Sequence, residues 1–274
     1  MTYSVIIPSL YEADGKYLKL CVTSLRESGF QGQIIVVTNG SKYQPKLPFG
    51  GVSVHLHTRD QGQCRATNIG AQVATGDYLM VSNSDMYYAP GWDKHLRFDY
   101  PVFSPNLVEP TNNHGSADPF LKVDGGFTID EFNKQAVDEE IKTIIKLHEA
   151  EGTKLSEPGF NLPFFIKRDL WDLLEGYDIG FDPWGSNSDT DLQTRINEAG
   201  VTPMRLRDVL VYHFSNKTDT FKPENDAFRM HNFEYFKEKH GFDRDELGSD
   251  VWYNKDMLPK DKERIKYDQK PYLS

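Results

Sequence analysis

The sequence predicts an α/β fold of three layers, in which helices cover both faces of a mostly parallel sheet. Short, β-branched apolar runs alternate with segments of helical periodicity through the first part of the chain, and this order is typical of strand–helix–strand units. The runs are nearly continuous in their apolar residues, as in strands that are buried on both faces. Several of them end in Pro, Gly or Asn, which places loops at the strand ends.

The first part of the chain contains four predicted strands and two predicted helices. The strands are Tyr3–Ile7, Gln33–Val37, Val52–His57 and Asp77–Val81. One helix is predicted at Tyr17–Gly29, where apolar residues recur at helical spacing and a glycine ends the run. The other is predicted at Gly62–Val73. Parallel neighbours need such crossover helices, so the order of elements favours a parallel sheet.

After Trp92 the regular alternation stops, and the second part of the chain is predicted to be more elaborate. The predicted elements are a strand at Tyr100–Phe103, an amphipathic helix at Ile129–Glu151, a strand at Phe160–Ile166, a short helix at Arg168–Leu174, a helix at Asp189–Ala199, a strand at Met204–His213 and a helix at Asp226–Lys239. The sequence has no repeat, low-complexity tract or clear linker, so residues 1–274 are predicted to form a single domain.

The composition argues against several classes of function. Lys and Arg number 31 against 41 Asp and Glu, and the formal charge of −10 argues against an extended surface for nucleic acid. The two cysteines, Cys21 and Cys64, do not have the spacing of zinc ligands, so neither zinc nor a disulfide framework is expected. Reduced cysteines, an N-terminus unlike a signal peptide and the lack of an apolar run of about 20 residues predict a cytoplasmic protein.

The stretch Ser82-Asn83-Ser84-Asp85 directly follows the fourth predicted strand. It therefore delivers a carboxylate to the carboxyl edge of the sheet, where open α/β sheets bind their ligands. Mg²⁺ and Mn²⁺ prefer carboxylate oxygens together with substrate phosphates, so one Asp there can position a metal-bound diphosphate. The alternative is a strand end closed by an ordinary Asx turn.

Four stretches, in this order along the chain, resemble those of family 2 glycosyltransferases with the GT-A fold. They are VIIPSLYE, RATNIGAQVATGDYLMVSNSD, FFIKRDLWDLLEGYDIGFDPWGSNSDTDLQTRINEAG and VYHFSNKT, which together span residues 3–217. The resemblance implies a GT-A-type sheet with an elaborated acceptor half. Residues 1–98 would then form the nucleotide-sugar-binding half, 99–225 the acceptor and catalytic half, and 226–274 a C-terminal helical extension.

The resemblance also implies a metal site. Asp85 matches the last Asp of the family's DxD motif and is the first predicted metal ligand, while Asn83 takes the place of the first Asp. His213 matches a His that some relatives use as a further ligand, and imidazole suits Mn²⁺ better than Mg²⁺. A His at a strand end is otherwise a satisfied structural residue. Mn²⁺ or Mg²⁺ would stabilise the diphosphate leaving group of a nucleotide-sugar donor.

In the segment SNSDTDLQTR, Asp189 falls where the family has its catalytic carboxylate. A carboxylate there would act as general base toward an acceptor hydroxyl, and direct displacement would invert the anomeric centre. Asp191 on the same turn and Trp184 before it are the predicted acceptor-side residues, with Asp191 orienting either the acceptor or the loop. The alternative is that Ser188 or Asp189 only caps the helix.

The resemblance places the nucleotide against Pro8, Ser9 and Glu12 on the first loop and against Arg65 and Asn68 on the second helix. Arg65 could instead pair with an Asp, and Asn68 could bond local backbone. Relatives end the second strand in Asp-Asp-Gly-Ser, whereas this chain has Thr38-Asn39-Gly40-Ser41. The resemblance favours a UDP-sugar as donor, and the amide of Asn39 can still offer an oxygen to a uracil N–H.

The sequence thus predicts a hexosyl- or N-acetylhexosaminyltransferase that acts on a glycan, lipid-linked or protein-linked hydroxyl, and it leaves a homo-oligomer open. Asn83 and Asn39, which replace acidic residues, leave a second hypothesis, a GT-A module that binds a nucleotide sugar or glycan without turnover. A sugar nucleotidyltransferase is the third hypothesis. It would need a Gly-rich, basic loop after the first strand to hold a triphosphate, and the segment PSLYEADGK has no such pattern.

Overall fold

The computed structural model describes residues 1–9, 11–40, 50–56, 62–111, 121–151, 155–183, 185–215 and 226–243. The strands are β1 (Tyr3–Ser9), β2 (Gln33–Asn39), β3 (Val52–Leu56), β4 (Tyr78–Val81), β5 (Met86–Tyr87), β6 (Val102–Pro110), β7 (Leu121–Val123), β8 (Ser156–Pro158), β9 (Phe164–Lys167) and β10 (Met204–His213). The helices are α1 (Tyr11–Glu27), α2 (Gln63–Val73), α3 (Lys134–Glu151), α4 (Arg168–Leu173), the 3₁₀ turn η1 (Ile179–Phe181), α5 (Ser188–Glu198) and α6 (Asp226–His240).

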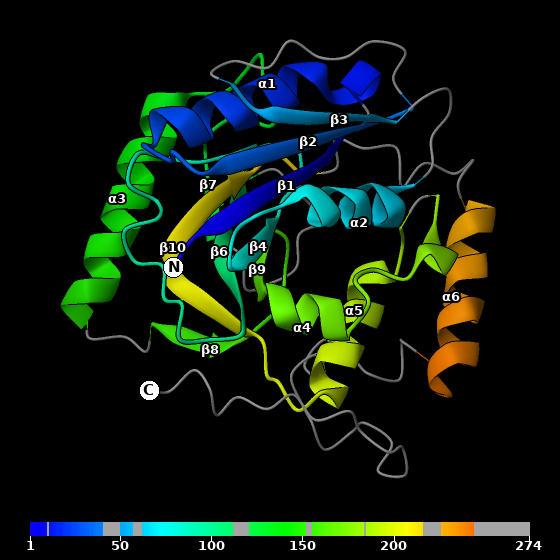
Figure 1. The fold of residues 1–274 in the computed structure, drawn as a ribbon. Helices are drawn as coiled ribbons and strands as arrows, with labels where there is room; N and C mark the ends of the chain where they lie inside the picture. The colour runs from blue at the N-terminus through cyan, green and yellow to red at the C-terminus, as the bar shows by residue number, and fades with distance from the viewer. Residues whose placement is uncertain are drawn as a thin grey trace.

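The ten strands form one sheet in the order β3-β2-β1-β4-β9-β6-β10-β5, with β7 beside β6 and β8 beside β10 (Figure 1). The strands β3, β2, β1 and β4 are parallel throughout. Strand β9 is antiparallel to both β4 and β6, and it joins this parallel part to the parallel pair β6 and β10. The predicted three-layer α/β sheet is therefore confirmed, and one sheet runs through both predicted halves.

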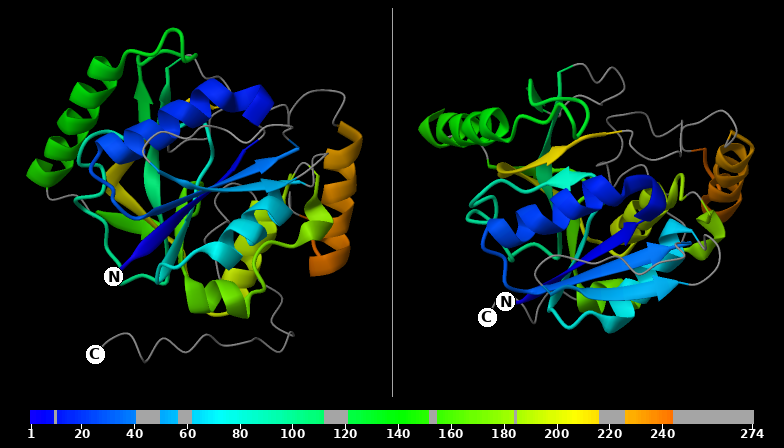
Figure 2. Two further views of the ribbon diagram at one scale, coloured as in Figure 1. Left: turned by 45° about the horizontal axis from the view of Figure 1, so that its top comes forward. Right: turned by 90° about the horizontal axis from the view of Figure 1, so that it is seen from above.

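Alternating side chains of the central strands supply two separate cores, one on each face of the sheet. On β1, Ile6 packs into the core beneath α2, α4 and α5, whereas Val5 and Ile7 pack into the core beneath α1. Burial of such β-branched residues on both faces explains the continuous apolar pattern of the strands. A third cluster joins α3 to β10, and Figure 2 shows α3 and α6 at opposite ends of the molecule.

The predicted helices and longer strands are all present, with shifted ends. Helix α1 begins at Tyr11, six residues before its predicted start at Tyr17. The prediction began too late because the first turns of the helix have no apolar periodicity. Strand β6 extends to Pro110, well beyond the predicted end at Phe103. In the part of the chain that the structure describes, no helix is both long enough and apolar enough to cross a bilayer.

Candidate functional site

The carboxyl ends of three parallel strands bring predicted site residues to one edge of the sheet. Ser9 ends β1, Asn39 ends β2, and Ser82 to Asp85 follow β4. Ser9 is paired in register with Thr38, and Ile6 with Val81, so these ends lie side by side. The predicted nucleotide contact Pro8 is partly buried on the same strand end. The structure thus brings the residues predicted to contact the nucleotide to the edge where ligands bind in open α/β sheets.

Asp85 and His213 are brought together by a short antiparallel pairing. Met86 on β5 is the register partner of His213 at the end of β10, and the amide of Phe214 donates to the carbonyl of Asp85. His213 Nε2 consequently lies 3.5 Å from Asp85 Oδ1. Asp85 is only 4% exposed. Two residues far apart in the sequence therefore present a carboxylate and an imidazole at one point.

Glu109 at the end of β6 holds the other side of the His213 ring. Its Oε1 lies 3.0 Å from His213 Nδ1 and accepts a hydrogen bond of 2.6 Å from Ser215 Oγ, while Lys122 Nζ lies 3.1 Å from Oε2. Burial alone would raise the pKa of Glu109, but its hydrogen bonds to His213, Ser215 and Lys122 lower the pKa to about 2. Burial would lower the pKa of His213, yet Asp85 and Glu109 together raise it to about 9.

The donor set of this corner suits a divalent cation bound together with a diphosphate. Among the described residues no three His, Cys, Asp or Glu side chains gather as a metal cage. Asp85 and His213 supply two ligands of the kinds that Mn²⁺ accepts, and phosphate oxygens with water would complete the coordination. Glu109 contacts Nδ1 of His213, and a carboxylate in this position orients the ring of a His that binds a metal through its other nitrogen. The residues present thus fit the predicted metal.

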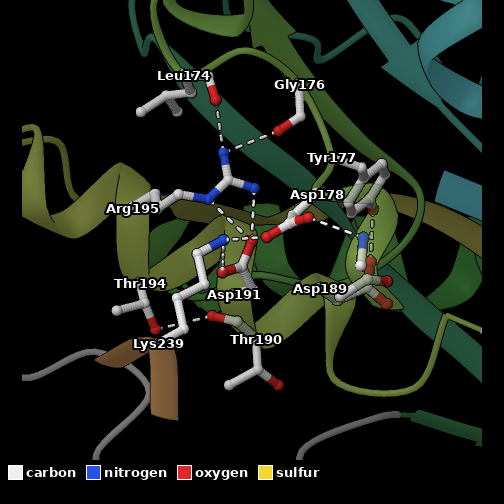
Figure 3. A network of polar contacts seen from close by, with 12 residues as sticks. Leu174, Gly176, Tyr177, Asp178, Asp189, Thr190, Asp191, Thr194, Arg195 and Lys239 are labelled. Carbon is white, nitrogen blue, oxygen red and sulfur yellow. Dashed lines mark hydrogen bonds and ion pairs between the residues drawn. The ribbon is translucent and has the colours of Figure 1, made fainter. Parts of the chain in front are cut away.

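Asp189 lies in the first turn of α5, but it is not the capping residue. The N-cap is Asn187, which has a φ of 66°, and Ser188 Oγ donates to the carbonyl of Gly185. Asp189 is instead held from the side: the hydroxyl of Tyr177 donates to Asp189 Oδ1 over 2.5 Å (Figure 3). The carboxylate is partly exposed, and its role as general base stays a prediction.

Asp191, two residues further on, is fully buried and surrounded by cations (Figure 3). Arg195 contacts Asp191 Oδ2 with Nε at 2.9 Å and Nη2 at 2.6 Å. On the other oxygen, Oδ1, Lys239 Nζ lies at 2.7 Å and His240 Nε2 at 2.9 Å. Burial would raise the pKa of Asp191, but His240, Arg195 and Lys239 lower it to about 2. Because Asp191 is fully buried, this arrangement favours orientation of the loop over orientation of the acceptor, the two roles predicted for it.

The start of α2 connects the sheet edge with the segment before α5. Asn39 Nδ2 donates to the carbonyl of Gly62 over 3.1 Å. The carboxylate of Asp182 accepts from the amides of Cys64 and Arg65 at 2.9 and 3.0 Å, and a Cβ at Gly62 would collide with that carboxylate. Asp182 thus supplies the anion that a helix N-terminus favours. Arg65 itself is exposed at this end of α2.

Asn68, predicted to contact the donor, is bonded to the backbone of Tyr177. Its Nδ2 donates to the carbonyl of Tyr177 over 2.7 Å, and its Oδ1 accepts from the amide of the same residue at 2.9 Å. Asn68 therefore bonds backbone groups, which is the alternative that the sequence left open. The backbone that it bonds is distant in the sequence, not local. Asn83 is half-buried, and its carbonyl accepts from Cys21 and Ser82.

The structure therefore brings predicted residues together in two groups, Asp85 with His213, and Asn68 with Asp189 through Tyr177. Trp184 and the side chain of Glu12 lie outside the described residues, so both stay predictions. Sequence reasoning missed Glu109 and Tyr177. Tyr177 stands within the motif LLEGYDIGFD, but only the folded chain shows which carboxylate its hydroxyl meets.

Comparison with known proteins gives one family match and several similar solved structures. Residues 4–97 match the family model described as Glycosyl transferase family 2. No curated protein matches the sequence. Among solved structures, TarS of S. aureus, residues 1–349, is similar with a TM-score of 0.53 and 15% identity over 90% of this chain and 74% of that chain. Crystal structures of TarS also exist in complex with UDP and with UDP-GlcNAc.

Two further solved structures share the fold. GalNAc-T7 with UDP, GalNAc and Mn²⁺ has a TM-score of 0.53 and 16% identity over 94% of this chain and 53% of that chain. The mannosyltransferase PcManGT from Pyrobaculum calidifontis, with GDP-Man and Mn²⁺, has a TM-score of 0.52 and 15% identity over 92% of this chain and 68% of that chain. At this identity the likeness concerns the fold. Residues 4–97 thus resemble glycosyl transferase family 2, and the chain shares the GT-A fold of these glycosyltransferases.

Proposed function

We propose that this chain transfers a hexosyl or N-acetylhexosaminyl group from a nucleotide-diphosphate sugar to a hydroxyl acceptor, with inversion at the anomeric carbon. The observation that carries the proposal is the pairing of Asp85 with His213 at the sheet edge, on the same fold that holds Asp189 at the start of α5. One corner suits a metal-bound diphosphate, and the other offers a carboxylate to the acceptor. A glycosyl transfer needs both.

Each residue has a defined task in the proposed reaction. Asp189 takes the proton of the acceptor hydroxyl as that oxygen attacks the anomeric carbon, and the bond from this carbon to the diphosphate oxygen breaks. Asp85 and His213 would hold Mn²⁺ or Mg²⁺, which when bound supplies positive charge to the leaving diphosphate. Pro8, Ser9 and Asn39 line the edge where the nucleoside would lie. Arg65, exposed at the start of α2, is available to the phosphates.

The favoured donor is a UDP-sugar. The support is that TarS binds UDP and UDP-GlcNAc and that GalNAc-T7 binds UDP with Mn²⁺, both on the fold of this chain. PcManGT, which binds GDP-Man, makes a GDP-sugar the natural competitor in any test. Both cysteines are free and buried, which is compatible with the reducing, cytoplasmic location that we propose.

The test is transfer and donor hydrolysis with UDP-GlcNAc, UDP-GalNAc, UDP-glucose and GDP-mannose, with Mn²⁺ and with EDTA. We expect turnover with at least one UDP-sugar and a loss of about 10²-fold or more in Asp189→Asn, since a general base contributes that much. Asp172→Asn, at an exposed position of α4, is the matched control. NMR of the product anomer checks the inversion. Tight UDP-sugar binding without turnover would instead establish the non-catalytic module.

A further inference from the structure

Tyr177 is the most enclosed side chain in direct contact with the proposed base. Its ring is 2% exposed and packs edge-on against Trp171 and Phe164, at centroid distances of 5.6 and 6.4 Å. A ring held in this way has no freedom to swing its hydroxyl away from a partner. The hydroxyl donates to Asp189 Oδ1 over 2.5 Å, as Figure 3 shows.

The backbone of Tyr177 is fixed from two other helices. Asn68 on α2 bonds both the amide and the carbonyl of Tyr177. Arg195 on α5 donates through Nη1 to the carbonyls of Leu174 and Gly176 at 2.6 and 2.8 Å (Figure 3). Gly176 has a φ of 68°, and a Cβ there would lie 2.6 Å from Asn68 Oδ1, so only glycine allows this close approach. These contacts are more than a core tyrosine needs.

The charges around Asp189 keep the Tyr177 hydroxyl in its donor form. Burial, followed by the negative charge of Asp189, raises the pKa of Tyr177 well above its ordinary value. Another titratable group near Asp189 is the thiol of Cys64 on α2, whose pKa is raised by burial and then by Asp182. Both neighbours are therefore neutral at physiological pH, and Tyr177 stabilises the ionised form of Asp189 by a charge-assisted hydrogen bond.

We propose that Tyr177 is the positioning residue of the general base: its hydroxyl fixes the orientation of the Asp189 carboxylate through the hydrogen bond to Oδ1. This inference rests on the proposed function of Asp189. Asn68 and Arg195 extend the same support, because they hold the backbone from which Tyr177 reaches the base. Phe keeps the aromatic ring of Tyr177 but has no hydroxyl. Tyr177→Phe therefore removes the hydrogen bond to Asp189 and keeps the packing of the ring.

The experiment compares Tyr177→Phe with the wild type and with Tyr235→Phe. Tyr235 also donates to an aspartate, Asp178 Oδ2 at 2.9 Å, and so controls for the loss of a tyrosine–aspartate hydrogen bond elsewhere. For Tyr177→Phe we expect kcat about tenfold lower, an unchanged KM for the donor, and an acidic limb of the pH–rate profile that lies about one pH unit higher. The loss of one hydrogen bond to a charged group accounts for a tenfold change in rate and for a shift of about one pH unit in the pKa of that group. Tyr235→Phe should leave all three unchanged.

A second readout does not depend on turnover. The ¹³C signal of the Asp189 carboxyl group, assigned by its loss in Asp189→Asn, should titrate about one pH unit higher in Tyr177→Phe than in the wild type. If the wild type is active but both midpoints stay where they are in Tyr177→Phe, the inference about Tyr177 is wrong and the proposed function stands. If the wild type turns over no donor, the proposed function fails, and the positioning role fails with it.

Discussion

At the scale of single residues, Glu109 controls how His213 faces Asp85. Its Oε1 holds His213 Nδ1 at 3.0 Å while His213 Nε2 points toward Asp85 Oδ1 at 3.5 Å. In Glu109→Gln the group facing Nδ1 loses its charge, so the ring is less firmly oriented. We expect Mn²⁺ binding, measured by calorimetry or electron paramagnetic resonance, to weaken about 10-fold or more, as for other groups that orient a ligating His.

Glu139→Gln is the matched control for this prediction, because Glu139 is exposed on α3, where its carboxylate accepts a hydrogen bond from Gln135. The control should bind Mn²⁺ like the wild type. Equal affinities for the wild type and Glu109→Gln would mean that His213 is oriented without Glu109, or that it is not a ligand.

The sequence allowed the prediction of residues that belong to a local pattern. Asp85 belongs to the short stretch that follows an apolar strand, and Asp189 lies in the acidic first turn of a helix, so both could be singled out as candidates from the sequence. Glu109 could not, because it lies among nine consecutive buried residues of β6 and its role depends on a residue 104 positions away. Tyr177 likewise acquires its role only when the turn after α4 meets α5.

At the scale of elements, Asp191 joins α5 to α6. Lys239 and His240 come from the last turn of α6, and both lie against the same carboxylate oxygen, while Arg195 binds the other. Removing one partner from a buried ionic cluster leaves charges unpaired, which costs about 3 kcal/mol or more. We expect Asp191→Asn to lower the free energy of unfolding by about that amount in urea titrations. Asp172→Asn should change it little.

The same carboxylate predicts a pH dependence of stability. Its pKa in the folded protein, about 2, lies below the ordinary aspartate value of 3.8, so the folded form binds the proton less readily than the unfolded chain. The stabilisation is therefore complete above about pH 4 and is lost as the pH falls through about 2. Between pH 4 and pH 2, the unfolding free energy should fall more steeply for the wild type than for Asp191→Asn. Parallel curves would show that Asp191 is not the group responsible.

The elements that the sequence could not predict are the short strands β5, β7 and β8, of two or three residues each. Periodicity needs several residues to be visible, and these strands exist because a long neighbour, β6 or β10, offers free backbone groups to them. Strand β5 matters most among them, because its pairing with β10 brings His213 to Asp85.

At the scale of the whole molecule, the candidate site draws on both ends of the described chain. Ser9 and Asn39 come from β1 and β2, whereas His213 comes from β10, and a single sheet connects them. A ligand bound at this edge contacts several strands of one sheet, and we expect these strands to unfold together. Its binding free energy should therefore appear as stability of the whole protein.

UDP with Mn²⁺ should accordingly raise the melting temperature. At a free ligand concentration of about 100 times Kd, the gain is about 2.7 kcal/mol, which corresponds to about 5–10 °C for a chain of this size. EDTA should remove most of the shift, because the diphosphate would then face the carboxylate of Asp85 without a cation between them. Asp85→Asn should remove the metal-dependent part, while Asp172→Asn keeps it. A shift that is the same with Mn²⁺ and with EDTA would show that the nucleotide binds without metal, and the roles given to Asp85 and His213 would have to be abandoned.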